Sequence, residues 1–236
     1  MRMSLETWMR LLLAGALALS LTAPARARKF RHPTDLTEIL SQMNEAGKRL
    51  KTVSANLEYT KVTALVDDKS TESGQLFFRK GKTTEIRVDI QKPDAKTLLF
   101  KKNRGEMYLP KINQIQEYDL TQKSDLVQQF LLLGFGSDTS ELKRNYTIKY
   151  LKEEDMEGDT TVLLELVPRK PNTAAQITKI QLWVSEESWL PTQQEFFQSG
   201  GDYLIAHYSG VRVNRDVPTS KFDLNAPESA KRVKMN

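Results

Sequence analysis

The chain has 236 residues, a formal net charge of +5 at pH 7, and 28% charged residues. It contains no cysteine, which excludes disulfides, catalytic thiols and thiolate metal sites. Its basic residues form only short runs without interleaved aromatic residues, so nucleic-acid binding is not expected. The runs within residues 26–31 and 231–234 indicate solvated surface charge, with room for weak attraction to anionic lipid surfaces.

Residues 1–27 have the pattern of a secretory signal peptide. Arg2 and Arg10 make the start positive, residues 11–19 are apolar, and Ala25-Arg26-Ala27 is a small-x-small cleavage site. The apolar run is too short for a comfortable membrane span. We expect cleavage after Ala27, with Ala25 as the alternative site and an uncleaved N-terminal anchor as the alternative fate. Residues 28–236 then form a single exported domain.

Residues 35–51 are predicted to form an amphipathic helix. Asp35 followed three residues later by Glu38 is typical of a capping box at a helix start. Apolar residues then recur at helical spacing from Leu36 to Leu50, with charged residues between them. We expect this helix to bury one stripe and to expose the other.

From about residue 54 to residue 120 the apolar period becomes two, which predicts short β-strands. The segments that alternate lie at 56–62, 74–79, 86–90, 98–100, 107–109 and 115–120, with turns at 67–68, 80–81 and 103–105. Such hairpin-like spacing favours an antiparallel meander over parallel crossover units.

A second helix is predicted near residues 124–133, and strands follow it. The helix is apolar and stops at Gly134-Phe135-Gly136. The later strands are expected at 146–151, 161–167, 177–184, 192–197 and 202–213. No internal repeat or low-complexity linker separates them, so one domain is expected.

The fold class predicted from these elements is α+β, mainly antiparallel β. Strands such as 76–78 and 162–167 are apolar on both faces and need cover on both sides. An unclosed half-barrel sheet with helices packed on the concave side supplies that cover. It also leaves an apolar space between sheet and helices that suits a ligand.

Sequence motifs for catalysis or metal binding are lacking. Neither His32 nor His207 has a partner at a catalytic or metal-ligand spacing. No nucleophile elbow, P-loop or dinucleotide fingerprint occurs. Paired carboxylates such as Asp67-Asp68 lie in predicted turns, where solvation explains them. We therefore expect neither enzymatic activity nor a metal or other cofactor.

The order of several segments resembles the periplasmic outer-membrane lipoprotein carriers, the LolA-like proteins. The similar segments are the helix 35–51, residues 74–80, residues 177–184 with the following Leu190-Pro191, and the ending 208–227 with Phe222. Together they span roughly residues 35–228. The resemblance implies an unclosed barrel with a helical lid, whose apolar cavity takes up the acyl chains of lipoproteins.

That resemblance also implies partners and a location. The chain is expected to be a periplasmic monomer that receives acylated lipoproteins or lipids from an inner-membrane release complex and delivers them to an outer-membrane acceptor. In these carriers an important arginine follows the first barrel strand and precedes a proline. Here the neighbourhood reads Arg79-Lys80-Gly81 without proline, so either Arg79 or Lys80 is the candidate lid and release residue. A one-residue shift would point the side chain to the other face.

The residues predicted to line the acyl-chain cavity are bulky apolar and aromatic residues of the strands and of the second helix. They are Leu76, Phe78, Ile86, Val88, Leu98, Phe100, Tyr108, Leu126, Phe130, Leu131, Leu164, Leu182 and Trp183. For each one alone, a purely structural core position is the simpler interpretation.

Four other functions remain open from the residues. The same fold suits a periplasmic transporter of lipids or glycolipids, or an envelope-stress sensor that binds lipoprotein as a signal. An exported enzyme would need a cluster of buried carboxylates with perturbed pKa values in the cavity. A structural envelope protein would have a filled core and no cavity.

Overall fold

The computed structural model describes residues 35–121, 133, 135–136 and 138–235. The chain divides into two units, Met1–His32 and Pro33–Asn236, and all of these residues lie in the second. Its strands are β1 (Thr52–Thr63), β2 (Asp68–Lys80), β3 (Thr84–Lys92), β4 (Lys96–Lys101), β5 (Arg104–Leu109), β6 (Gln114–Asp119), β7 (Tyr146–Met156), β8 (Asp159–Pro168), β9 (Ile177–Ser185), β10 (Pro191–Gln198), β11 (Tyr203–Val213) and β12 (Lys231–Met235).

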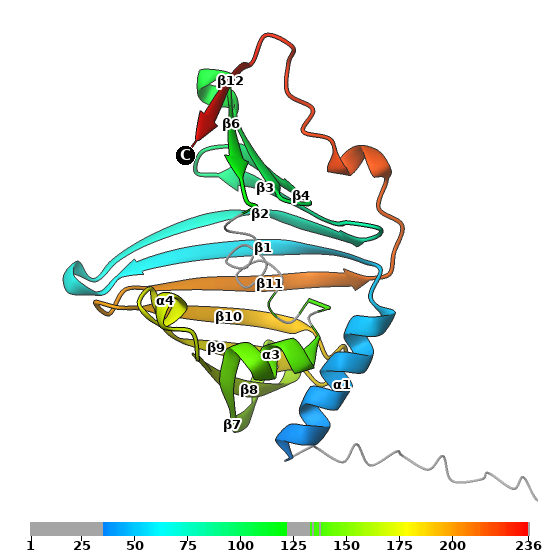
Figure 1. The fold of residues 1–236 in the computed structure, drawn as a ribbon, viewed down its shortest axis with the longest axis vertical. Helices are drawn as coiled ribbons and strands as arrows, with labels where there is room; N and C mark the ends of the chain where they lie inside the picture. Colours follow the sequence, from blue (N-terminus) through cyan, green and yellow to red (C-terminus); the bar gives the residue numbers. More distant parts are fainter. Residues whose placement is uncertain (1–34, 122–132, 134, 137, 236) are drawn as a thin grey trace, which may run out of the picture. The chain divides into compact units, whose positions relative to one another are not determined.

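These strands form one sheet in the order β12-β6-β5-β4-β3-β2-β1-β11-β10-β9-β8-β7 (Figure 1). Neighbouring strands are antiparallel, except that β12 runs parallel to β6. The two ends of this order, β12 and β7, are not paired with each other in the described part of the chain. The sheet is therefore unclosed.

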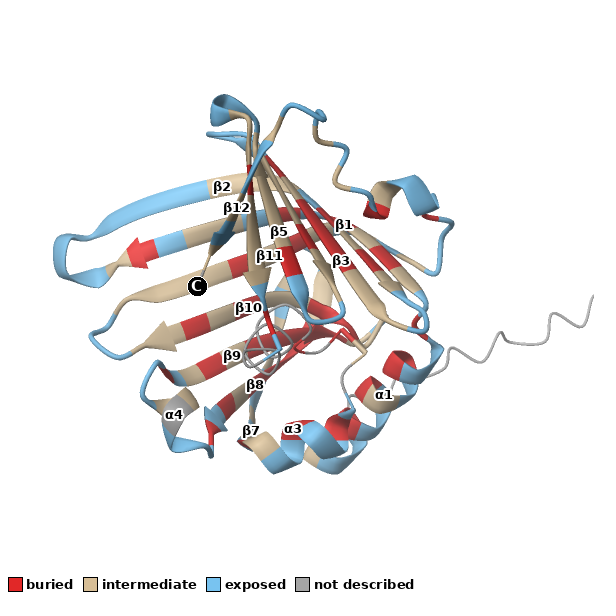
Figure 2. Cartoon of the chain, turned by 45° about the horizontal axis from the view of Figure 1, so that its top comes forward, coloured by how far each residue is buried: buried red, intermediate tan, exposed pale blue. Residues whose placement is uncertain are grey.

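The first helix, α1 (Leu36–Arg49), begins where the sequence predicts. The side chain of Asp35 accepts a hydrogen bond from the backbone N–H of Thr37, which satisfies one of the free donors at a helix start. Ile39, Leu40 and Met43 are buried on one side. Figure 2 shows the resulting alternation of buried and exposed segments along this helix.

Contacts of α1 with both halves of the sheet show that the sheet curves around it. Ile39, Leu40 and Met43 belong to one buried cluster with apolar residues of β8–β10. Ala46 and Leu50 belong to a second cluster with residues of β1–β3 and β11. The strands β3 and β8 are six positions apart in the strand order, and one helix reaches both only if the sheet bends toward it. We call the face toward α1 the inner face, and the expected half-barrel with helices on its concave side is confirmed.

The chain beyond β11 covers part of the opposite, outer face. Val217 and Phe222 are buried against Leu99 of β4, with Phe77 of β2 packed beside them. Phe222 ends a short 3-10 helix, η4 (Thr219–Phe222). The strands β2 and β4, which carry apolar residues on both faces, are thus covered by α1 on the inner side and by this segment on the outer side.

The predicted strands are confirmed, most of them with longer bounds, and several further elements were not predicted. Among them are the short helix α3 (Thr139–Asn145) and the strand β12. The composition of residues 231–234 predicts a solvated basic run. In the structure Arg232 instead binds the carboxylates of Glu106 and Glu117, so these charges anchor the strand to the sheet. The second helix, predicted near 124–133, lies outside the described residues except for Leu133.

Candidate ligand cavity

A cavity of about 730 Å³ lies on the inner face of the sheet. This volume is within the roughly 300–1,000 Å³ typical of small-molecule sites. The strands β1–β4 and β9–β11 supply its walls, together with the segment that follows the short helix α4 (Pro171–Ala174). The lining residues are Leu57, Tyr59, Glu72, Leu76, Val88, Ile90, Lys96, Leu98, Ala175, Gln176, Ile177, Gln194, Phe196, Gln198, Ser199, Leu204, Ala206 and Tyr208.

The cavity walls are apolar because successive inward positions of each strand carry apolar residues. Leu76 of β2 pairs with Val88 of β3, which pairs with Leu98 of β4, so the three side chains share one face. Leu76 and Val88 are buried. Burial also raises the pKa of the Tyr208 phenol well above its ordinary value. The deep part of the cavity is therefore buried and weakly polar.

The polar groups at the deep end bind each other. Gln194 is fully buried, and its side-chain amide donates a 2.6 Å hydrogen bond to the carbonyl of Leu133. The Tyr208 hydroxyl in turn donates to Oε1 of Gln194 over 3.2 Å. Phe135 packs edge-on against the Tyr208 ring. Because these buried polar atoms have partners inside the protein, they do not require a polar ligand.

The other end of the cavity carries charge. Lys96 of β4 and Glu72 of β2 form a 2.7 Å ion pair whose side chains are about one quarter exposed. Burial, and to a smaller extent the carboxylate of Glu72, raise the pKa of Tyr59. Ala175, Gln176 and Ser199 are exposed at this end. The cavity therefore runs from an exposed polar mouth to a buried apolar interior.

Three of the residues predicted from the sequence, Leu76, Val88 and Leu98, line this cavity. Phe78, Ile86 and Phe100 lie on the same face and in the same apolar cluster, but they are not among the residues that line the cavity. Leu164 and Leu182 are also on the inner face, within the cluster under the first turns of α1. Leu126, Phe130 and Leu131 lie outside the described residues.

Tyr108 and Trp183 lie on the outer face, and this corrects their predicted inward orientation. Met107, not Tyr108, is opposite the inward Leu98, and Trp183 follows the inward Leu182 on β9. Successive side chains of a strand point to opposite faces. The Trp183 indole N–H donates to Glu154 Oε1 on that outer side.

Several lining residues on β1, β10 and β11 were not predicted. They are Leu57, Tyr59, Gln194, Phe196, Leu204, Ala206 and Tyr208. Strict alternation at 57 and 59, and at 204, 206 and 208, was the available signal. Ala206 is the least conspicuous of them, because its small side chain leaves space instead of filling it.

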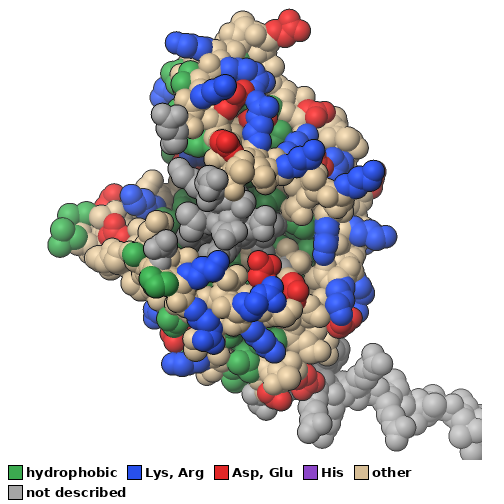
Figure 3. Space-filling view, in the orientation of Figure 1, with side chains coloured by type: hydrophobic (Ala, Val, Ile, Leu, Met, Phe, Trp, Pro, Cys, Tyr) green, Lys and Arg blue, Asp and Glu red, His purple; other side chains and the backbone are tan. Residues whose placement is uncertain are grey.

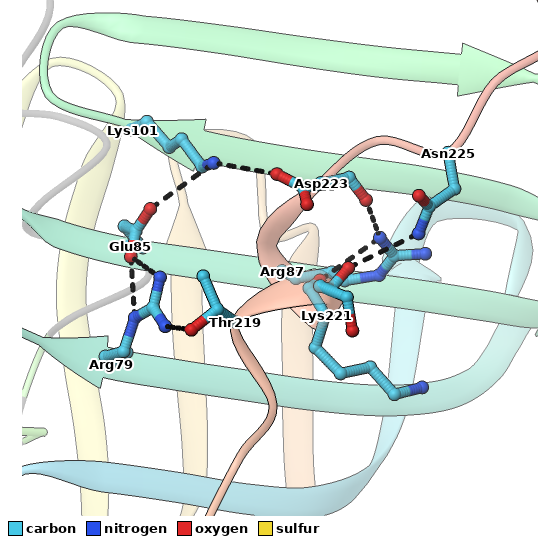
Figure 4. A network of polar contacts seen from close by, with 9 residues as sticks. Arg79, Glu85, Arg87, Lys101, Thr219, Lys221, Asp223 and Asn225 are labelled. Carbon is cyan, nitrogen blue, oxygen red and sulfur yellow. Dashed lines mark hydrogen bonds and ion pairs between the residues drawn. The ribbon is translucent and has the colours of Figure 1, made fainter.

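Arg79 lies on the outer face and holds the C-terminal segment (Figure 4). Its guanidinium binds Glu85, donating from Nε over 2.7 Å, and lies 4.3 Å from the centre of the Phe222 ring. Lys101 bridges Glu85 and Asp223 in the same network. Nearby, Arg87 pairs with Asp89 and donates to the backbone carbonyls of Lys221 and Asp223. Arg79 therefore faces away from the cavity.

Lys80, one position further, contacts α1. Its Nζ donates a 3.1 Å hydrogen bond to the carbonyl oxygen of Gly47 in the last turn of the helix. Carbonyls in a last turn lack intrahelical partners and carry partial negative charge, so an ammonium group is favourable there. Of the two candidate lid residues, Lys80 is the one that holds the helix to the sheet.

We expect Lys80→Met to loosen α1. Loss of this hydrogen bond should lower the free energy of unfolding by about 1 kcal/mol and speed amide hydrogen exchange in the helix. Denaturant unfolding and hydrogen exchange measured by mass spectrometry check both effects. Lys82→Met, at an exposed neighbouring lysine, is the matched control. Equal exchange rates in the two variants would contradict a latch at Lys80.

A second hollow of about 580 Å³ lies near the C-terminal end of α1 and is more polar. His207 Nε2 is 3.6 Å from Glu157 Oε2 there, and Ser185 donates to Asp159 over 3.1 Å. Among the described residues that line the first cavity, Glu72 is the single carboxylate. The described residues contain no group of three His, Asp or Glu side chains placed to hold a metal ion, and no helix among them is long and apolar enough to cross a membrane.

Comparisons of the sequence with known proteins give relatives without an assigned function. A family model described as "Uncharacterized protein" matches residues 82–214, more than half of the chain. An uncharacterized protein of Methanocaldococcus jannaschii is 26% identical over 196 residues, which are 82% of this chain and 52% of that protein. The chain thus spans about half the length of this curated relative.

Comparisons of the structure show the fold. MucB, from Pseudomonas aeruginosa, matches with a TM-score of 0.55 and 14% identity, over 85% of this chain and 66% of MucB. Lipoprotein LppX from Mycobacterium tuberculosis matches with a TM-score of 0.50 and 11% identity, over 78% of this chain and 99% of LppX. A LolA superfamily protein from Nitrosomonas europaea is also similar, with a TM-score of 0.39 and 16% identity, over 79% and 96% of the two chains. MucB and LppX therefore share the fold of this chain, and the unclosed half-barrel expected from the sequence is confirmed.

Proposed function

The chain belongs to the family of uncharacterized proteins whose model matches residues 82–214, and we propose that it is a periplasmic carrier of acylated lipoproteins. In this proposal the cavity binds the acyl chains, and the carrier shuttles its cargo from the inner to the outer membrane. An inner-membrane release complex supplies the cargo and an outer-membrane acceptor receives it. The predicted signal peptide at residues 1–27 supports an exported location.

The observation that carries this proposal is the space inside the curved sheet. A purely structural protein would fill its inner face with its own side chains, as protein interiors are normally packed. Here about 730 Å³ lies between apolar walls. Each buried methylene contributes about 0.8 kcal/mol, so such a space stabilises acyl chains that would otherwise be exposed to water.

The cavity supports binding and release without chemistry. Glu72 is the single carboxylate among the described lining residues, and it is paired with Lys96. The apolar interior and the polar mouth match an amphiphile whose acyl chains enter first. We therefore propose a non-enzymatic carrier that needs no cofactor.

A sensor on the same fold is the second candidate. MucB, which shares the fold, is known from its structure to form a complex with MucA(peri). A chain that binds lipoprotein as a signal would use the same cavity but would keep its ligand. A transporter of phospholipid or glycolipid would differ in the ligand alone.

Native mass spectrometry of the purified protein distinguishes these functions. The protein is incubated with a triacylated lipopeptide, with phospholipid or with glycolipid, and then with empty acceptor vesicles. We expect one-to-one capture of the lipopeptide and its release to the vesicles. Capture without release indicates a sensor, and preferred capture of phospholipid or glycolipid indicates lipid transport. Absence of any bound amphiphile would overturn the cavity proposal.

A further inference from the structure

The hairpin between β1 and β2 ends in an exposed apolar turn. The 3-10 helix η2 (Ala64–Val66) forms this turn, and Leu65 is 92% exposed and Val66 is 68% exposed. The pairing of β2 with β3 stops at Ser73 and Lys92, so the last residues of the hairpin extend beyond β3 (Figure 1). Figure 3 shows hydrophobic side chains gathered at its end. We call Leu65 and Val66 the apolar tip.

The conformation of the turn is held by specific contacts. The Asp202 side chain accepts a 3.0 Å hydrogen bond from the backbone N–H of Ala64. Asp67, with φ of 49°, closes the turn in the left-handed region, which aspartate tolerates better than most residues. These contacts fix the turn in a conformation that points the apolar tip outward. Water is an unfavourable environment for such side chains, and exposed apolar clusters mark interaction sites.

Aromatic and cationic side chains lie one row behind the apolar tip. Tyr203, opposite Val62, stacks on Phe197 with ring centres 5.5 Å apart. The Lys179 ammonium lies 4.5 Å from the centre of the Phe197 ring. From the tip inward, the side chains are first apolar, then aromatic, and then lysine. The same order of groups is found at a membrane–water interface.

The mouth of the cavity opens at this same end of the sheet. Tyr59 pairs with Glu72 on the stem of the hairpin, and both line the mouth. Ser199 lines it from the turn between β10 and β11. That turn also carries Asp202, which holds Ala64. One structural unit therefore joins the apolar tip to the entrance of the cavity.

We propose that the apolar tip inserts into a lipid bilayer and places the cavity mouth against the membrane surface. The proposal rests on the carrier function, because the membrane is where an acyl chain enters or leaves. Lys61 and Lys69 near the tip are balanced by Asp67 and Asp68. Insertion is therefore driven by apolar burial and not by attraction to anionic lipids.

The absence of cysteine from the chain allows a site-specific test in the full protein. Leu65→Cys carries a polarity-sensitive fluorophore, and Ile112→Cys, at an exposed apolar residue of another turn (60% exposed), is the matched control. With phosphatidylcholine vesicles we expect a blue shift at position 65 and none at 112, unchanged by added anionic lipid or salt. If the emission of the fluorophore shifts equally at positions 65 and 112, the proposal is overturned. A blue shift at position 65 that appears only when a protein partner is added also overturns the proposal, because the tip would then be a protein-docking site.

A second variant separates this proposal from the carrier function. Leu65→Ser combined with Val66→Ser should reduce the rate of ligand transfer to vesicles at least tenfold, with unchanged capture of monomeric lipopeptide in solution. Unchanged transfer overturns the membrane role of the tip even if capture occurs. If the unaltered protein does not capture lipopeptide, the carrier function is overturned, whatever the fluorophore at position 65 reports.

Discussion

Ala206→Phe is expected to weaken the binding of acylated ligands at least tenfold while leaving the fold intact. Ala206 of β11 is on the inner face, between Tyr59 and Gln194 of the adjoining strands, and its side chain borders the cavity. A phenyl ring at this position occupies space that the ligand needs. Displacing two methylenes from the cavity costs about 1.6 kcal/mol, which exceeds the roughly 1.4 kcal/mol that corresponds to a factor of ten in affinity.

Ile205→Phe is the matched control for this experiment. Ile205 is the preceding residue of the same strand and points to the outer face, where it pairs with Thr60 and Glu195. Titration of a fluorescent fatty-acid analogue, displaced by lipopeptide, measures affinity for both variants. Thermal unfolding checks that both remain folded. If the two variants bind alike, the ligand does not occupy this cavity.

The strands were predictable because one property, apolar alternation, repeats throughout the sheet. The face of each residue was harder to predict, because many strands are apolar on both sides. Trp183 and Tyr108 are large aromatic residues, yet the hydrogen-bonded register places them on the outer face. Register depends on how neighbouring strands pair, and a one-residue change exchanges the two faces.

Neither the cavity nor the place of β12 in the sheet could be predicted from the sequence, and the reasons differ. Bulky residues identify a core, whereas a cavity also requires small residues such as Ala206 at facing positions. The strand β12 has three basic residues among five, so its composition predicts a solvated segment. Its place in the sheet comes from backbone pairing with β6 and from the ion pairs of Arg232. These contacts join residues more than a hundred positions apart.

Phe222→Ala is expected to lower the free energy of unfolding by about 3–5 kcal/mol, the usual cost of removing a fully buried phenylalanine side chain. Phe222 has no exposed surface, packs with Leu99 and Val217, and lies under the Arg79 guanidinium. Removing the ring leaves a void and deprives Arg79 of its cation–π partner. Urea unfolding of the purified protein measures the change.

The same variant tests whether the two faces of the sheet act independently. Phe222 contacts the outer face, whereas the ligand cavity lies on the inner face. We therefore expect lipopeptide affinity to stay within twofold under conditions in which the variant is still folded. Leu224→Ala, at a half-buried residue of the same segment, should cost less stability and serves as the control. A large loss of affinity in Phe222→Ala would instead mean that the C-terminal segment fixes the curvature of β2–β4, and hence the shape of the cavity.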